Sequence, residues 1–118
     1  MFWRSGLTAA ETDRRLHLDP VSGVLRAVGE ITMASADRWV RLFAQTLSEL
    51  PAAGSRTTVS VDLAGVVRCD SAVLAVIAQW DVMAHAQGVT LTTCNAPAHL
   101  RAIARLCGAG DVWGLDRR

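Results

Sequence analysis

The stretch that decides the fold is Thr58-Val59-Ser60-Val61-Asp62-Leu63, followed by Ala64-Gly65-Val66-Val67-Arg68-Cys69 and then by Asp70-Ser71-Ala72-Val73-Leu74. Apolar and polar residues alternate over 58–63, which predicts a β-strand with one buried face. The segment 64–69 is predicted to be a short loop. An apolar run then predicts a helix from Ser71 to Gln87, ended by Gly88. One serine therefore stands in the first turn of a helix that follows a buried strand.

Two strands and a helix are predicted before this stretch. Alternation from Arg15 and again over Val24–Val28, on either side of Pro20-Val21-Ser22-Gly23, predicts a hairpin that ends at Gly29. A helix is predicted after Ser35, because apolar residues then recur at a spacing of three to four as far as Leu50.

A strand and a helix are predicted after it. Val89–Thr93 is rich in β-branched residues, and Asn95 with Pro97 predicts the start of a last helix that ends before Gly108. The order is then ββαβαβα. Strands connected through helices pair in parallel, so the predicted fold class is α/β, a small mixed β-sheet with helices packed against it.

Length and composition predict one domain. The chain has 118 residues, of which 51% are hydrophobic and 19% charged, enough to bury a core without disulfides or metal. We expect an N-terminal arm over 1–14, where Phe2 and Trp3 follow no period, and a single domain over 15–118. The longest apolar run, Ala72 to Ala78, is far below the roughly 18 residues of a membrane span, and the N-terminus lacks a signal-peptide core. We therefore expect a cytoplasmic protein without direct membrane insertion.

Charge and residue types exclude several classes of function. A net charge of +1 gives no electrostatic reason to bind nucleic acid. Every basic residue except the histidines is an arginine, which excludes a Walker lysine, a Schiff-base lysine and a kinase lysine. The three cysteines and three histidines lack the spacing of a metal site. No glycine-rich phosphate loop is present, so no cofactor is expected. Ser71 lacks the glycine-flanked elbow of a hydrolase nucleophile, and we expect no enzyme activity.

Three motifs occur in the same order and at the same separations as in a known family. They are Gly29-Glu30-Ile31-Thr32, then Val61-Asp62-Leu63 with Asp70-Ser71-Ala72, then Gly88-Val89-Thr90-Leu91 with Asn95-Ala96-Pro97. In this arrangement the chain resembles the STAS family from about residue 15 to residue 115. Known members include anti-sigma-factor antagonists and the MlaB-type subunits of phospholipid-transport ABC complexes. The resemblance implies a STAS-like single domain that docks on other proteins.

Ser71 has two interpretations. A serine hydroxyl at a helix start can cap an orphan amide and contribute about 1 kcal/mol. In the antagonists, the serine after the motif aspartate is phosphorylated by a partner kinase, and the resemblance assigns that role to Ser71. A phosphate there would meet the positive end of the helix dipole.

Two positions separate the two branches of the family. Antagonists usually carry glycine where this chain has Val73, and the branched side chain of valine restricts the close approach of a kinase. They also usually carry aspartate where this chain has Thr32. Thr32, Ser71-Ala72 and Trp80 are closer to the MlaB-like branch, which binds a transporter ATPase. The resemblance therefore favours an MlaB-like partner, the cytoplasmic ATPase subunit, which would bring the chain to the inner membrane. An antagonist that binds an anti-sigma factor serine kinase stays the alternative.

The predicted helix has an uncharged outer face. Helical spacing puts Val73, Ile77, Trp80 and Ala84 on one side as a core stripe. Small and apolar residues line the opposite side, where a surface helix normally carries charges. They let another backbone approach closely, although alanines also simply favour helix formation. The predicted partner-binding residues are Thr32, Asp70, Ser71, Ala72, Ala75, Ala78 and Val82.

Overall fold

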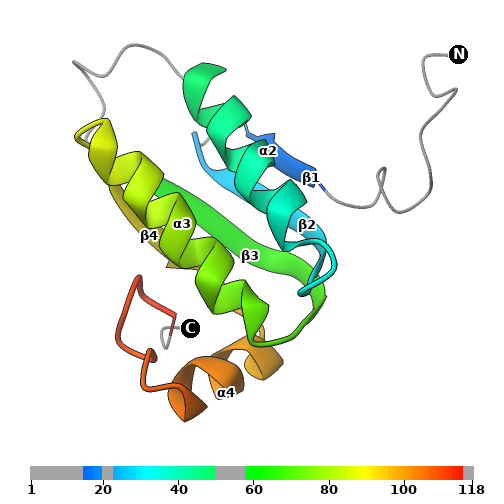
Figure 1. The fold of residues 1–118 in the computed structure, drawn as a ribbon. Helices are drawn as coiled ribbons and strands as arrows, with labels where there is room; N and C mark the ends of the chain where they lie inside the picture. Colours follow the sequence, from blue (N-terminus) through cyan, green and yellow to red (C-terminus); the bar gives the residue numbers. More distant parts are fainter. Residues whose placement is uncertain (1–14, 20–22, 50–57, 116–118) are drawn as a thin grey trace, which may run out of the picture.

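The computed structural model describes residues 15–19, 23–49 and 58–115. The predicted arm over 1–14 and most of the predicted turn at 20–23 lie outside the described residues. The elements are β1 (Arg15–Leu18), β2 (Leu25–Ile31), α2 (Ala36–Glu49), β3 (Thr58–Cys69), α3 (Ala72–Ala86), β4 (Thr90–Cys94) and α4 (Ala98–Leu106). Figure 1 shows this ββαβαβα order, which the sequence predicted.

The four strands form one mixed sheet in the order β1-β2-β3-β4. The β1–β2 hairpin is antiparallel, whereas β2 pairs with β3 and β3 pairs with β4 in parallel. Each parallel connection passes through a helix, α2 in the first case and α3 in the second. The predicted fold class, α/β with a small mixed sheet, is confirmed.

Strand β3 is longer than predicted, because residues 64–69 continue it instead of forming a loop. Its second half pairs with β2 as far as Ile31 and Cys69, but the register shifts twice on the way. Between the Leu25–Val61 and Ile31–Cys69 pairs, β3 uses two more residues than β2. Such bulges break the alternation of buried and exposed residues that identifies a strand in a sequence.

Strand β2 likewise continues past Gly29, where the sequence predicted its end. Gly29 has a φ of +128°, a conformation that side chains rarely adopt and glycine accepts. The extension carries Glu30 and Ile31 beside the end of β3, and it brings the turn after β2 next to the start of α3.

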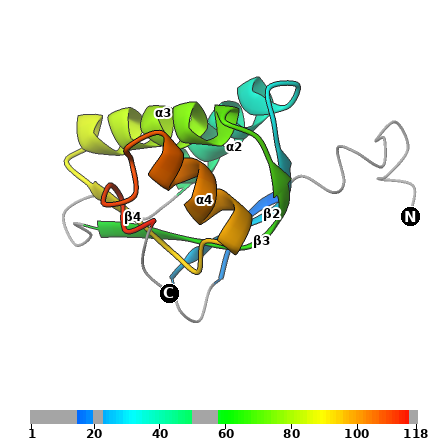
Figure 2. The same cartoon turned by 90° about the horizontal axis from the view of Figure 1, so that it is seen from below.

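Helices α2 and α3 lie side by side on one face of the sheet, and α4 lies at its end on the same side (Figure 2). The core between the layers is centred on aromatic residues of the two helices. Trp80 stacks on Phe43 with ring centroids 5.4 Å apart, and its indole N–H donates to the carbonyl of Trp39 at 3.1 Å. The predicted core stripe of α3 is confirmed, since Val73, Ile77, Trp80 and Ala84 are all fully buried. No helix in the described ranges has the length and apolarity needed to cross a membrane.

Candidate functional site

The candidate site is the corner at which β2 and β3 end and α3 begins, and Asp70 holds this corner together. Its Oδ1 accepts a hydrogen bond from the amide of Ala72 at 2.9 Å, and its Oδ2 accepts one from the amide of Met33 at 3.1 Å. The Asp70 amide donates to the carbonyl of Ile31 at 3.3 Å. One residue thus caps α3 and connects it to β2 and to the turn that follows β2.

The turn between β2 and α2 is fixed from the other side by Ser35, which is buried. Its hydroxyl donates to the carbonyl of Glu30 at 3.0 Å and accepts a hydrogen bond from the amide of Thr32 at 3.0 Å. Thr32 is half-buried, and Met33 is 76% exposed. Thr32 therefore lies in the same turn as Met33, whose amide contacts Asp70.

Ser71 does not cap the helix, which corrects the first interpretation of this residue. It already has helical dihedral angles, φ −61° and ψ −17°, and its side chain makes no capping hydrogen bond. A serine hydroxyl caps from an extended backbone, so the helical conformation of Ser71 leaves this role to the carboxylate of Asp70. The Ser71 side chain is exposed and makes no hydrogen bond with the described part of the chain.

Helix α3 exposes a face of small and apolar side chains, which Asp81 and His85 flank near its C-terminal end. Ser71 and Ala75 are exposed, Ala78 is half-buried, and Val82 is 64% exposed. Over its whole length the only polar residues of the helix are Gln79, Asp81 and His85. A helix that is apolar around most of its circumference is usually covered on every side.

The neighbouring helix α2 shows the ordinary pattern of a solvated surface helix. Its outward side chains include Asp37 and Arg41, which form an exposed ion pair one turn apart at 3.7 Å, and Gln45. Both helices pack on the same face of the sheet, so solvent exposure alone does not explain why α3 carries fewer charged residues than α2.

Ala72 differs from the other predicted contact residues. Its side chain is 7% exposed and lies about a quarter turn away from the outer face of α3. Its amide is the group that Asp70 caps. Ala72 thus belongs to the corner through its backbone, while its methyl group packs inward.

Cys69 lies next to the corner, but its thiol is not activated. Burial, and secondly the charge of Asp70, raise the pKa of Cys69 from 9.0 to about 11. A thiol with such a pKa keeps its proton at neutral pH and is a poor nucleophile. Among the residues that the structure describes, no cluster of three or more His, Cys, Asp or Glu side chains is placed to hold a metal ion.

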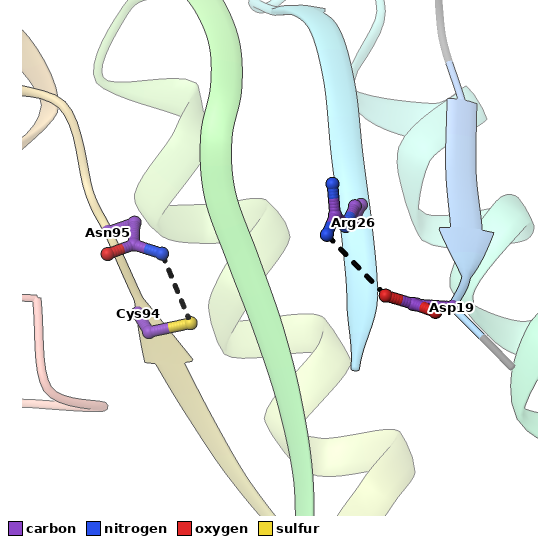
Figure 3. A network of polar contacts seen from close by, with 4 residues as sticks. All are labelled: Asp19, Arg26, Cys94 and Asn95. Carbon is purple, nitrogen blue, oxygen red and sulfur yellow. Dashed lines mark hydrogen bonds and ion pairs between the residues drawn. The ribbon is translucent and has the colours of Figure 1, made fainter. Parts of the chain in front are cut away.

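The sheet face opposite the helices is a polar surface. Arg26 on β2 is paired in register with Asp62 on β3, which in turn pairs with Cys94 on β4. Figure 3 shows Arg26 pointing toward Asp19, with 3.5 Å between Nη2 and Oδ2, and the amide of Asn95 donating to the sulfur of Cys94 at 3.9 Å. These contacts are weak and solvent-exposed. Among the described residues of this face, the side chains do not form a metal-binding cluster.

The mixed sheet, with its parallel β2–β3 and β3–β4 pairs and helices on one face, defines this chain as a small α/β domain. The family model STAS_2, described as "Mlab, STAS domain", matches residues 4–115, and the chain belongs to this family. A search of curated proteins found no match.

Among solved structures, the fold is similar to that in "Crystal Structure Analysis of Mglu", with a TM-score of 0.52 and 23% sequence identity. The match covers 80% of this chain and 22% of that one, so this chain spans about a fifth of the other protein's length. At this identity the likeness concerns the fold.

Sequence patterns missed one exposed residue of the corner, Met33. The exposure of Met33 depends on the conformation of its turn, which is fixed by hydrogen bonds from Asp70 and Ser35. Hydrophobic periodicity does not record these hydrogen bonds. The only sequence signal is a methionine between a strand motif and a helix start, which does not separate an exposed residue from a buried one.

Proposed function

We propose that this chain is a non-catalytic STAS subunit that binds the cytoplasmic ATPase of a phospholipid-transport ABC complex. The contact surface is the exposed face of α3, with Thr32 and Ser71 at its N-terminal end. Under this proposal the chain acts in the cytoplasm and reaches the inner membrane through its partner. Its contribution is assembly or support of the ATPase, without a chemical step of its own.

The observation that carries the proposal is the uncharged face of α3 beside the charged face of α2. Ala75 and Val82 are exposed there, and side chains of this size let a partner helix or loop approach the α3 backbone closely. Charged residues are depleted at the centre of protein interfaces. Membership of the MlaB-type STAS family supports an ATPase as the partner.

The second candidate function is an anti-sigma-factor antagonist that is switched by phosphorylation of Ser71. The exposed hydroxyl of Ser71, which makes no hydrogen bond with the described residues, favours it because a kinase needs an accessible acceptor. The steric argument against it is weaker than the sequence indicated, because the Val73 side chain is fully buried and does not obstruct the surface. Thr32, in place of the aspartate of the antagonists, remains the residue that separates the two functions.

The test is a pair of identical substitutions on neighbouring helices, Ala75→Arg on α3 and Ala44→Arg on α2. Both alanines are exposed, so both variants are expected to fold. An unpaired arginine forced into an interface costs about 2–5 kcal/mol, so Ala75→Arg is expected to weaken ATPase binding at least about thirtyfold. Ala44→Arg is expected to leave the affinity within about twofold of the wild type.

The partner is identified by affinity purification from the native cells, and its affinity is then measured by calorimetry with the purified ATPase. The intact mass of the co-purified chain is recorded in the same experiment. Binding that survives Ala75→Arg excludes the α3 face as the contact. A serine kinase as the stoichiometric partner, or one phosphate on Ser71, favours the antagonist instead.

A further inference from the structure

Met33 stands out among the exposed apolar side chains. It is 76% exposed and lies in the turn between β2 and α2. A single exposed apolar side chain is common on protein surfaces and requires no explanation by itself. The distinguishing feature of Met33 is that the surrounding backbone is held in place from two sides.

The carboxylate of Asp70 is the first group that fixes the backbone of this turn. Its Oδ2 accepts the amide of Met33 at 3.1 Å, while its Oδ1 accepts the amide of Ala72 at 2.9 Å. The same carboxylate therefore binds the turn and the first turn of α3. Ser71, which is exposed, lies between Asp70 and Ala72 in the chain, so the backbone of Met33 is held at the start of α3.

Ser35 is the second residue that fixes the turn, and it connects the turn to the end of β2 by hydrogen bonds. Its buried hydroxyl contacts the amide of Thr32 and the carbonyl of Glu30, each at 3.0 Å, and its own amide donates to the carbonyl of Thr32 at 3.0 Å. Thr32 and Ser35, which lie on either side of the Met33-Ala34 pair, are thus hydrogen-bonded to each other before any partner binds.

We propose that Met33 is an anchor residue for the ATPase partner and that Asp70 is the positioning residue that presents it. This inference rests on the proposed function and adds a contact outside α3. A backbone that is already ordered lowers the entropy cost of binding. A methionine side chain is flexible and polarisable, and it packs into irregular apolar pockets. The partner surface is therefore an uncharged apolar pocket beside the region that covers α3.

The test is a double-mutant cycle on ATPase affinity with Met33→Ala and Asp70→Asn. Truncation of an interface anchor is expected to weaken binding about tenfold. Asparagine keeps one carbonyl oxygen for one amide but presents an NH2 group to the other, so Asp70→Asn is expected to release the turn. If Asp70 acts through Met33, the double variant binds no more than about twofold more weakly than the weaker single variant.

Two further variants separate an apolar anchor from a structural effect on the turn. Met33→Leu keeps the apolar side chain and is expected to retain wild-type affinity within about threefold, whereas Met33→Gln is expected to match Met33→Ala. Leu106→Ala serves as the matched control, because Leu106 is 87% exposed at the end of α4 and lies outside the proposed contact. Its affinity is expected to stay within about twofold of the wild type.

The outcomes distinguish this inference from the proposed function. Wild-type affinity for Met33→Ala, together with loss of binding in Ala75→Arg, overturns the anchor role and leaves the proposed function standing. Additive losses in the cycle overturn the positioning role of Asp70. Equal affinity of Met33→Gln and the wild type also overturns the anchor. Failure of the unmodified chain to bind the ATPase overturns the proposed function itself.

Discussion

Replacement of Gly65 by alanine tests whether β2 and β3 pack as tightly as the structure indicates. A Cβ atom at Gly65 would lie 2.8 Å from the carbonyl oxygen of Ala27 and 3.0 Å from Cγ2 of Val28. The closer neighbour is backbone of the paired strand, which cannot rotate away as a side chain does. Ordinary contacts of a Cβ atom begin at 3.4 Å, so the strands have to move apart by about half an ångström at the centre of the sheet.

Two opposing effects set the size of the change. Overpacking of this kind costs about 1–3 kcal/mol. Gly65 is not among the glycines with positive φ, so alanine fits its backbone conformation and regains about 0.4–1 kcal/mol by restricting the unfolded chain. The strain term is larger, and the net loss in the free energy of unfolding is about 1–2 kcal/mol. For a chain of 118 residues this corresponds to a fall in Tm of about 4–8 °C.

The measurement is thermal unfolding followed by circular dichroism, with urea unfolding as the second estimate of the free energy. Ala64→Val is the control, because Ala64 precedes Gly65 in the same strand and its side chain is exposed; its effect is expected to stay within about 0.5 kcal/mol. A Gly65→Ala variant as stable as the wild type, or more stable, refutes the reasoning. The entropy term would then exceed the strain, and the contact with Ala27 would be looser than described.

Three further predictions concern the core and the half-buried thiol of Cys69. Trp80→Phe removes an indole N–H that donates to Trp39 at 3.1 Å and part of the stack on Phe43; we expect a loss of about 2–3 kcal/mol by urea unfolding, and a loss below about 1 kcal/mol contradicts this packing. Cys69, whose pKa is raised to about 11, is expected to be alkylated by iodoacetamide more slowly than exposed Cys107 at pH 8, as measured by peptide mass spectrometry. Because the unfolded thiol releases its proton near pH 9 while the folded one keeps it to about 11, the Cys69 contribution to stability falls between these pH values. Equal labelling of both thiols at pH 8 contradicts the Cys69 prediction.

The sequence was sufficient for the element order and for the buried side of α3. Both depend on periodicity, and the helix from Ala72 to Ala86 keeps its apolar stripe at helical spacing throughout. The second half of β3 was predicted to be a loop for the converse reason. Its two bulges shift the alternation, and its pairing with β2 is a tertiary contact that no local pattern in residues 64–69 records.

The roles of Asp70 and Ser71 could be predicted only as a pair. Both residue types favour the N-terminal cap of a helix, and adjacent candidates are separated by backbone dihedral angles that a sequence does not specify. The structure puts Ser71 in the helical conformation and leaves the cap to Asp70. The exposure of Met33 could not be predicted from the sequence for a similar reason. It depends on hydrogen bonds that Asp70 and Ser35 make with the backbone of the turn.

This division of roles between adjacent residues has a functional consequence. Because the carboxylate of Asp70 satisfies the Ala72 amide and holds the Met33 turn, the start of α3 does not depend on the Ser71 hydroxyl. Ser71 is then free to contact a partner without a cost to the stability of the helix. The same separation means that a change at Asp70 affects both the fold and the presented surface, whereas a change at Ser71 affects the surface alone. Effects on binding that arise at Ser71 therefore report on the interface directly, and those at Asp70 have to be separated from changes in the turn.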